Sequence, residues 1–414
     1  ALHTFDRAQK KAEGWQLEDE AAALEQDALR EEITWTQKLR SALNEVPDLE
    51  EAHATLAEHY AHELHRAEAE RDAPAATRFA ALLDEHAGKL SEAGRRRYDA
   101  VRRGDGALTL ITEPADAQVL IKRYEPSLRY LMLDERSAEL LRAPLRSLDL
   151  ARGSYLLILS APGHRDLRYP VMIGRGEHWD GIRPGGAAPE AIRLLRDDEL
   201  GPDDVYVPPG PFVAGGDPRA GEGLTRRRVW VDGFVIRKHP VTNAEYLGFL
   251  DALVAEGRGE EARRFCPRLH PGASLGDEDL LAYPRDPITG RFTLEDAAQQ
   301  ASLPVVFVDW HAAMAYAAHL AKQTGQPWRL PSELEWEKAA RGVDGRFMPW
   351  GDQVEPTWAC VSGSHDKPKR LMSIHDYPTD VSPYGVRGMV GNVRDWCVER
   401  WSLGGPKVER GVVQ

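Results

Sequence analysis

Residues 328–350 constrain the fold of this chain most, because they combine a proline turn, a capped helix and three tryptophans. Ser332 and Glu335 stand three positions apart, which is the spacing of a capping box at a helix N-terminus. Gly342 stands where a left-handed residue ends a helix. The apolar face of this predicted helix consists of Leu334, Trp336, Ala339 and Ala340. A short helix flanked by large aromatic side chains has to pack into a core.

The polar face of the same helix carries Glu333 and Glu337, four positions apart. Lys338 and Arg341 are their neighbours, and acids and bases at such spacings form ion pairs on helix surfaces. We interpret the two glutamates as partners in solvated ion pairs on an exposed face rather than as an acid–base pair for catalysis.

Three motifs of this region resemble the sulfatase-modifying-factor family, which comprises the formylglycine-generating enzymes and their relatives, and they occur in the same order. They are WRLPSELEWEKAARG (328–342), MPWGD (348–352) and SPYGVRGMVGNVRDW (382–396). Two upstream segments are similar to the same family, PVTNAEYLGFL (240–250) and LPVVFVDWHAAMAYAAHLA (303–321). The resemblance covers about residues 203–414 and implies a C-type-lectin-like fold there.

Residues 1–104 are rich in Ala, Glu, Leu and Arg, a composition typical of packed helices. A helix that begins near Pro47 places Ala52, Leu56 and Tyr60 at intervals of four residues. This pattern looks like one tetratricopeptide-type hairpin, although one copy cannot form a solenoid. The same helix carries three histidines at intervals of three, His59, His62 and His65. We interpret these histidines as part of a solvated face rather than as a metal site.

From residue 105 to about 200 the apolar pattern changes to a period of two, which predicts a small β-sandwich of short antiparallel strands. The strand segments are ALTLITEP (107–114), QVLIKRY (118–124) and SYLLILSAPG (154–163). The turn residues between them are similar to those of the PEGA domain, a module of bacterial surface and signalling proteins. We expect an insertion at about 125–142 and a linker at 174–203.

The last predicted domain spans residues 201–414. Its expected elements are an edge strand within 205–216, a strand from Val229 to Ile236, a helix capped by Thr242 and Glu245, and a helix from Asp309 to Gly325. Residues 257–302 are polar and poorly periodic, so we expect an inserted loop that carries recognition. Deleting such a loop is expected to leave the fold intact.

Composition excludes several classes of function. The 414 residues carry a net charge of −13 without a basic block, which gives no electrostatic footprint for nucleic acid. No run of about 18 apolar residues and no signal peptide stand out, so we expect a cytoplasmic chain with no membrane contact. The contiguous Ser364, His365 and Asp366 do not form a nucleophilic triad by sequence proximity. The first residue is Ala1, which suggests a fragment of a longer protein.

The family resemblance implies a test for copper. The formylglycine-generating enzymes bind copper through two cysteines near the C-terminal end, and soft sulfur ligands suit Cu(I). Here Cys266, Cys360 and Cys397 are far apart in sequence, and no cysteine follows Cys397. The H-x-x-x-H-x-E motif of the related iron-dependent sulfoxide synthases is absent as well. The residues of this chain therefore support neither a copper site nor an iron site. We interpret Cys397 as a buried small side chain. We also expect the domain to be C-terminally incomplete.

The resemblance also implies a structural calcium, which needs six or more oxygen ligands. The expected donors lie in the GNVRDW loop: the Asp395 carboxylate, backbone oxygens near Val390, Gly391 and Val393, and Asn392, which orders the turn. Asp395 replaces the usual glutamate of the family and reaches less far, so a simple turn is the alternative to a calcium site.

Taken together, the sequence predicts a multidomain α+β protein with a helical segment (1–104), a PEGA-like sandwich with a linker (105–200) and a formylglycine-generating-enzyme-like domain (201–414). We expect a non-catalytic recognition, regulatory or scaffold protein that binds a protein partner or a small ligand. Architectures that resemble this one follow bacterial Ser/Thr kinases, which suggests covalent fusion to a kinase domain. The alternative is a metal-dependent oxidase of the formylglycine-generating or sulfoxide-synthase type.

Overall fold

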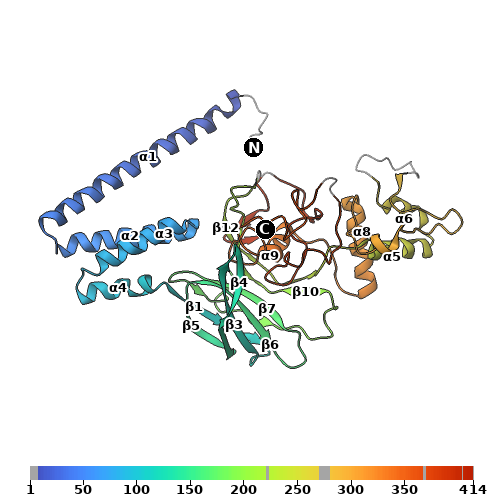
Figure 1. The fold of residues 1–414 in the computed structure, drawn as a ribbon, viewed down its shortest axis with the longest axis horizontal. Coiled ribbons are helices and arrows are strands. Elements are labelled where there is room, and N and C mark those ends of the chain that lie inside the picture. Colours follow the sequence, from blue (N-terminus) through green and yellow to red (C-terminus); the bar gives the residue numbers. More distant parts are fainter. Residues whose placement is uncertain (1–7, 221–222, 270–279, 367–369, 403, 414) are drawn as a thin grey trace. The chain divides into compact units, whose positions relative to one another are not determined.

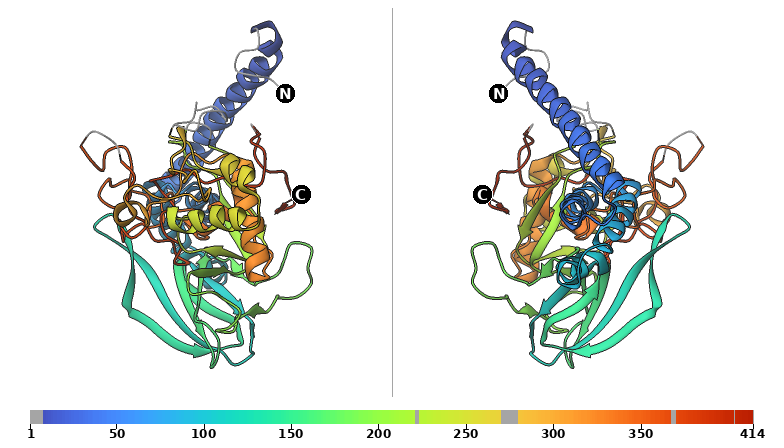
Figure 2. Two further views of the ribbon diagram at one scale, coloured as in Figure 1. Left: turned by 90° about the vertical axis from the view of Figure 1, so that its right-hand side faces the viewer. Right: turned by 90° about the vertical axis from the view of Figure 1, so that its left-hand side faces the viewer.

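A computed structural model gives the fold of the chain (Figures 1 and 2). It describes residues 8–220, 223–269, 280–366, 370–402 and 404–413. The chain divides into two compact units, Ala1–Asp105 and Gly106–Gln414. The first is helical and the second combines strands and helices, so the predicted α+β class with an N-terminal helical segment is confirmed. No described helix is long and apolar enough to cross a membrane.

Four helices form the first unit (blue in Figure 1). They are α1 Ala8–Glu45, α2 Glu50–Glu70, α3 Ala73–Ala87 and α4 Glu92–Arg103. Asp72 and Ser91 cap α3 and α4 by accepting hydrogen bonds from backbone N–H groups of the first turn. The predicted periodicity of α2 is confirmed, because Ala52, Leu56 and Tyr60 are buried in the shared core.

Two buried histidines join α2 to α3. His53 Nε2 lies 2.9 Å from the carbonyl oxygen of Pro47, so this nitrogen carries the hydrogen and donates. His53 Nδ1 is therefore the acceptor for His86 Nδ1, 2.9 Å away. Burial lowers the pKa of His86, and the proximity of His53 lowers it further, against the opposing effect of Glu85.

Acid is expected to loosen this helical unit. Because the pKa of His86 is lower in the folded state than its ordinary value of 6.5, the unfolded state binds more protons, and stability falls as the pH drops below about 6.5. Amide hydrogen exchange of the full chain, corrected for intrinsic rates, should show less protection of α2 and α3 at pH 5.5 than at pH 7.5.

The matched control for this experiment is the exposed His65 on α2. His65→Gln should keep the pH dependence of α2 protection, whereas His86→Phe should abolish most of it. Equal protection of the unmodified chain at both pH values would contradict the assignment of His86 as the responsible group.

Strands dominate the first part of the second unit (Figure 1). They are β1 Asp105–Leu110, β2 Thr112–Glu113, β3 Gln118–Ser127, β4 Tyr130–Arg142, β5 Leu145–Ala151, β6 Gly153–Ser160, β7 Leu167–Ile173, β8 His178–Trp179 and β9 Ile192–Arg193. Strands β4, β3, β6 and β7 form an antiparallel sheet in that order, and β5, β1 and β8 form a second sheet. Both sheets contribute to one core, which includes Leu108, Val119, Leu157, Val171 and Trp179.

Residues 125–142, where an insertion was expected, belong to the sheet. These residues complete β3 and form β4, which pair with each other along their length. Leu128 and Arg129 connect the two strands with φ values of 47° and 70°. Such a two-residue turn normally contains glycine, asparagine or aspartate. None of these residue types stands at the two positions, so no sign of a hairpin is visible in the sequence.

Residues 174–203, where a linker was expected, also contain strands. β8 pairs in parallel with β1, and β9 pairs in parallel with β2. Trp179 and Ile192 are buried in the sandwich core, and Trp179 Nε1 donates to the hydroxyl of Tyr169 at 3.0 Å. Frequent Gly and Pro suggested a linker, but these residues shape turns between two-residue strands that are too short to show a periodic pattern.

The remaining elements are short and irregularly connected. They are β10 Asp204–Val207, β11 Gly210–Ala214, β12 Arg227–Val231, β13 Phe234–Arg237, α5 Asn243–Ala255, α6 Gly259–Phe265, α7 Ala297–Gln300, α8 Trp310–Thr324, α9 Glu333–Arg341, β14 Val408–Glu409 and β15 Val412–Val413. The capping box of Thr242 and Glu245 is confirmed. Asp309 caps α8, and Gly325 ends it with a φ of 71°, also as predicted.

Residues 257–302 are not a removable loop. They contain α6 and α7, and four of their side chains are buried against α5: Ala262, Cys266, Tyr283 and Phe292. Tyr246 of α5 donates its hydroxyl to the carbonyl oxygen of Phe265 at 2.8 Å. Deletion of the segment would expose this core, which corrects the expectation from sequence. Residues 270–279 of the predicted loop lie outside the described residues.

A buried ion pair connects the sandwich to the last part of the chain within the second unit. Arg346 is 2% exposed, and its Nη2 lies 2.7 Å from Asp344 Oδ2. Ser154 of β6 donates to the same carboxylate at 2.7 Å, and the guanidinium lies 4.5 Å from the ring centre of Tyr124 in β3. Burial alone would raise the pKa of Asp344, but Arg346 outweighs it and lowers the pKa to about 2.

Removing one member of this pair is expected to be costly. Arg346→Met leaves a buried, uncompensated carboxylate, so it should reduce the free energy of unfolding by roughly 3–5 kcal/mol. The double variant with Asp344→Leu should recover a large part of this loss. Urea unfolding followed by tryptophan fluorescence measures both. The effects of Arg346→Met and Asp344→Leu on the free energy of unfolding should not add. A double variant whose loss equals the sum of the two single losses would refute the coupling between Arg346 and Asp344.

Candidate functional site

Helix α9 is positioned at its N-terminus by side-chain caps. Ser332 Oγ accepts the N–H of Glu335 at 3.1 Å, and Glu335 accepts the N–H of Ser332 at 2.7 Å, so the predicted capping box is confirmed. Arg329 holds the Glu335 carboxylate through two hydrogen bonds of 2.8 and 2.7 Å. Gly342 ends the helix with a φ of 73°. The direction in which Glu333 points is therefore fixed by the helix start.

Lys338 fixes the other end of α9, and it contradicts the expectation of a solvated polar face. The side chain is 1% exposed, and Nζ donates to the carbonyl oxygens of Pro208, Gly210 and Val231 at 2.8, 3.1 and 3.2 Å. Burial lowers its pKa to about 7, although Asp232 acts in the opposite direction. Lys338 follows the buried Leu334 by four positions, and this spacing is the signal that places it on the inner face.

Glu337 is not a solvated acid either. It accepts the backbone N–H of Gly215 at 2.8 Å and pairs with Arg341. Arg341 is buried and also donates to the carbonyl oxygen of Arg346 at 2.6 Å. The predicted pairing of neighbouring charges on α9 is present, but it is directed into the protein and links the helix to the strands around it.

Tryptophan indoles hold the segment 395–398 beside α9. Its backbone is also tied to the residue before the helix, since Val398 N donates to the carbonyl oxygen of Pro331 at 2.9 Å. The three indole bonds, each 3.0 Å long, run from Trp336 to the Asp395 carboxylate, from Trp310 to the carbonyl of Cys397 and from Trp396 to the carbonyl of Val308.

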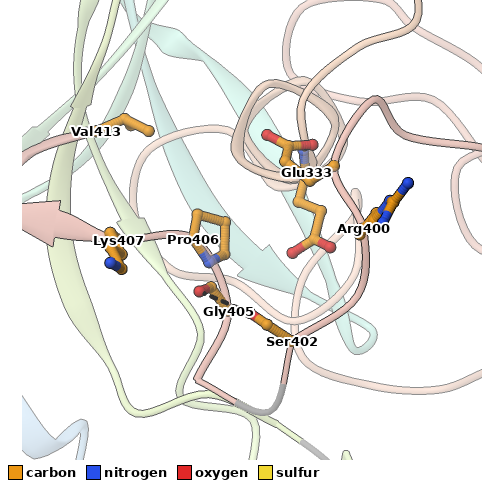
Figure 3. Close-up of a pocket in the computed structure, with 8 residues that line it drawn as sticks. Glu333, Arg400, Ser402, Gly405, Pro406, Lys407 and Val413 are labelled. Carbon is orange, nitrogen blue, oxygen red and sulfur yellow. Dashed lines mark hydrogen bonds between the residues drawn. The ribbon is translucent and has the colours of Figure 1, made fainter.

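A cavity of about 220 Å³ lies where this segment passes the N-terminus of α9 (Figure 3). Its lining residues are Glu333, Glu399, Arg400, Ser402, Gly405, Pro406, Lys407 and Val413. Glu333 lies between Arg400 and Pro406 in the figure, with its carboxylate directed toward Ser402 and Gly405. The lining thus combines two carboxylates, a guanidinium, an ammonium and a hydroxyl.

The two glutamates of the cavity differ in their hydrogen bonding. Glu399 Oε2 accepts the backbone N–H of Glu333 at 3.0 Å, which satisfies one free donor at the start of α9. The Glu333 carboxylate has no hydrogen bond or ion pair within the described part of the chain. Burial raises its pKa, and the nearby charges of Glu399 and Glu337 raise it further. The helical pattern predicted Glu333 on the helix surface, and no pattern in the sequence pointed to Glu399.

The loop predicted to bind calcium is organised by a buried carboxylate that the sequence did not reveal. Asp380 accepts the N–H groups of Met389 and Val390 at 3.2 Å each. Burial raises the pKa of Asp380 to about 6, although these hydrogen bonds act in the opposite direction. Asn392 has a φ of 69°, and its amide bonds the backbone N–H and carbonyl of Met372 at 3.0 and 2.8 Å.

Several predicted calcium donors already accept hydrogen bonds. Asp395 Oδ2 receives the indole N–H of Trp336, Asn392 Oδ1 receives the N–H of Met372, and the Gly391 carbonyl receives the N–H of Val393. An oxygen that accepts one hydrogen bond retains a second lone pair, and no hydrogen bond to Asp395 Oδ1 or to the Val390 and Val393 carbonyls occurs among the described residues. No arrangement of three or more His, Cys, Asp or Glu suited to a metal occurs in the described residues. The calcium site stays a prediction.

The three cysteines have different surroundings. Cys266 is buried near the carbonyl oxygen of Tyr283, and burial raises its pKa to about 11. Cys360 Sγ lies 3.6 Å from Nε2 of His365, and burial raises the pKa of this thiol as well. Burial and four nearby carboxylates raise the pKa of Cys397 to about 12. All three are free thiols that stay protonated at neutral pH.

The structure does not assemble the contiguous Ser364, His365 and Asp366 into a triad. Ser364 Oγ donates to the carbonyl of Ala359 at 2.6 Å, while His365 Nε2 contacts Cys360 and the hydroxyl of Tyr377. The histidines of α2 also diverge: His59 approaches Glu32 at 3.4 Å, whereas His62 and His65 are exposed.

Lys338 is expected to be indispensable for the stability of this region. Lys338→Met removes the three hydrogen bonds of a buried ammonium group, and hydrogen bonds to charged groups contribute about 1.5–3 kcal/mol each. We expect a loss of at least about 3 kcal/mol in urea unfolding of the full chain. Lys322→Met is the matched control, because Lys322 forms only an exposed ion pair with Glu256, worth at most about 1 kcal/mol. Similar losses for both variants would contradict the role of Lys338.

Comparison with known proteins relates this site to a family. Residues 193–414 match the model of the sulfatase-modifying factor enzyme 1-like domain. The formylglycine-generating enzyme of Thermomonospora curvata is 30% identical over 49% of this chain and 73% of its own length. The inactive C-alpha-formylglycine-generating enzyme 2 of Mus musculus is 30% identical, over 49% of this chain and 71% of that protein.

Other relatives are much longer than the matched region. The serine/threonine-protein kinase Pkn1 of Chlamydia trachomatis is 30% identical over 48% of this chain and 28% of the kinase. The chain spans only 35% of the length of the Bacillus subtilis protein YfmG, to which it is 31% identical over 42% of its own length. Because the family model matches more than half of the 414 residues, this chain belongs to the sulfatase-modifying factor enzyme 1-like family.

Proposed function

We propose that this chain is a non-catalytic recognition part of a larger regulatory protein, and that its family domain receives a ligand in the cavity beside α9. The observation that carries this proposal is the composition of the cavity. Glu333, Glu399, Arg400 and Lys407 supply hard, charged groups suited to binding a polar ligand, and none of the described lining residues is a cysteine or a histidine.

The state of the thiols supports the same proposal. Cu(I) is held by soft sulfur ligands, and the copper site of the family uses two cysteines that lie together. Cys397 follows the family motif directly, and the charged groups that raise its pKa are carboxylates. Cys360 contacts His365 and Cys266 contacts Tyr283, so the two other thiols belong to separate surroundings.

Relatives support the regulatory context. The mouse relative carries the word inactive in its name, so the family accommodates members named as lacking the activity. The Chlamydia trachomatis relative is a kinase of which this chain matches only 28%. We propose that this chain likewise works in signalling, joined to a kinase domain or to another effector, and that ligand binding regulates that effector.

A metal-dependent oxidase remains the second candidate, and one observation favours it. Cys397 lies close enough to the cavity for the charges of Glu333 and Glu399 to raise its pKa. A metal held by this thiol would lower that pKa and place a reactive centre beside the cavity.

Oxygen consumption separates the two candidates. With Cu(I) or Fe(II) and a cysteine-containing peptide, we expect the full chain to consume oxygen no faster than the metal and peptide alone. Cys397→Ala should leave this background rate unchanged, and Cys266→Ala serves as the matched control. Oxygen uptake that depends on Cys397 would refute the recognition proposal and establish the oxidase.

A further inference from the structure

A cysteine, a histidine and a tyrosine away from α9 bring three metal-binding heteroatoms together. Cys360 Sγ lies 3.6 Å from His365 Nε2, and the hydroxyl oxygen of Tyr377 lies 3.2 Å from the same nitrogen. Burial raises the pKa of Tyr377, and the nearby Cys360 raises it further, so the thiol and the phenol are also neighbours. All three residues are half-buried, so solvent reaches the cluster.

The hydrogen bonding within this cluster is incomplete. A ring nitrogen offers either one hydrogen or one lone pair, so Nε2 of His365 cannot form a full hydrogen bond with both Cys360 and Tyr377. Another contact of the thiol is long, since Sγ lies 3.9 Å from the carbonyl oxygen of Arg370. A metal ion between the three heteroatoms would bind all of them at once.

The spacing of the heteroatoms fits a tetrahedral zinc ion. Zinc binds sulfur at about 2.3 Å, imidazole nitrogen at about 2.0–2.1 Å and oxygen at about 2.0–2.2 Å. In a tetrahedron these bond lengths place sulfur about 3.6 Å from nitrogen and oxygen about 3.4 Å from nitrogen. The separations in the structure, 3.6 and 3.2 Å, are close to these values, so the ion fits without a rearrangement of the cluster.

The turn that carries Cys360 and His365 is held by the side chain between them. Ser364 Oγ donates to the carbonyl oxygen of Ala359 at 2.6 Å and accepts the N–H of Val361 at 2.8 Å. Ser364 N donates to the carbonyl oxygen of Val361 at 3.0 Å. These bonds fix the two metal-binding side chains relative to each other, which reduces the entropy lost when an ion binds.

The backbone positions Cys360 and Tyr377 as well. The carbonyl oxygen of Cys360 accepts the N–H of Asn392 at 2.8 Å, and a Cβ at Gly391 would lie only 2.1 Å from it, so this close approach requires glycine. Tyr377 has a φ of 55°, in the left-handed region that bulky residues rarely adopt. Residues in such conformations concentrate at functional sites, where the surrounding structure holds them.

The donors and the charge around them favour zinc. Thiolate, imidazole and phenolate suit Zn²⁺, whereas Ca²⁺ and Mg²⁺ prefer sites made of oxygens. A coordinating thiol loses its proton to the metal, so the raised pKa of Cys360 does not prevent binding. Burial raises the pKa of Cys360 and of Tyr377, and the Asp376 carboxylate raises both further, so a cation is favoured here, although Arg370 acts in the opposite direction on Tyr377.

We propose that Cys360, His365 and Tyr377 form a binding site for one zinc ion, with water in the fourth position. Zinc replaces the hydrogens of the thiol and the phenol, and both protons pass to solvent, so the ion and its two anionic ligands are neutral together. None of the three side chains belongs to the predicted calcium loop at 390–395. The site goes beyond the proposed recognition function and does not depend on it.

The test is a titration of the full chain with Co²⁺ without oxygen, because cobalt replaces zinc and its absorption reports thiolate ligands. One equivalent should produce a thiolate-to-cobalt charge-transfer band, and one equivalent of zinc should remove it. Cys360→Ser should abolish the band, and His365→Gln and Tyr377→Phe should each weaken zinc binding at least tenfold. Cys397→Ala and His375→Gln are the matched controls and should change neither the band nor the affinity.

Two further measurements separate a lost ligand from a lost fold. With EDTA present, each variant should unfold at the same temperature as the unmodified chain. In the unmodified chain, one equivalent of zinc should slow alkylation of Cys360 at least tenfold and leave that of Cys397 unchanged, and an excess of Ca²⁺ should not reverse this protection.

Four outcomes would overturn the proposal. They are no charge-transfer band in the unmodified chain, a band that persists in Cys360→Ser, unchanged zinc affinity in both His365→Gln and Tyr377→Phe, or equal alkylation of Cys360 with and without zinc. Displacement of the zinc by Ca²⁺ would also refute a thiolate site, because calcium competes for oxygen ligands.

Discussion

The ammonium group of Lys338 is the interaction on which the arrangement of the family domain depends. Three strand-end carbonyls converge on one nitrogen, so the helix and the strands cannot move independently without breaking several buried hydrogen bonds. The position of α9 then determines where Glu333 points and where the segment after Trp396 passes. The cavity is a consequence of this anchoring, since its walls come from the helix start and from that segment.

Much of the fold was predictable from sequence wherever a local rule applied. Capping boxes at Thr242 and Ser332 and a glycine stop at Gly342 identified helices, because their geometry depends on residues that are three to ten positions apart. The strands β3 and β6 were visible from their apolar periodicity. The strands that were not predicted are those that pair with strands far away in the sequence, such as β8 and β9. Each is two residues long and therefore shows no periodic pattern.

The candidate site was less predictable than the fold, for a physical reason. Motif positions identified α9, but the sequence could not show that Lys338 is buried or that Glu399 caps the helix from 66 positions away. Asp380 was missed because a carboxylate bound by two backbone N–H groups has no spacing signature. The sequence also could not show that oxygens of the proposed calcium loop accept hydrogen bonds from Trp336, Met372 and Val393.

The buried pair of Arg346 and Asp344 has a consequence for how such proteins evolve. Its partners Ser154 and Tyr124 belong to the sandwich, and Leu131 of β4 donates to the carbonyl of Trp350 at 2.8 Å. A recombination event that transferred the family domain alone would leave a salt bridge and an aromatic surface open to water. A relative that shares only the family domain therefore needs other residues at the positions of Arg346 and Asp344, or another segment that covers them.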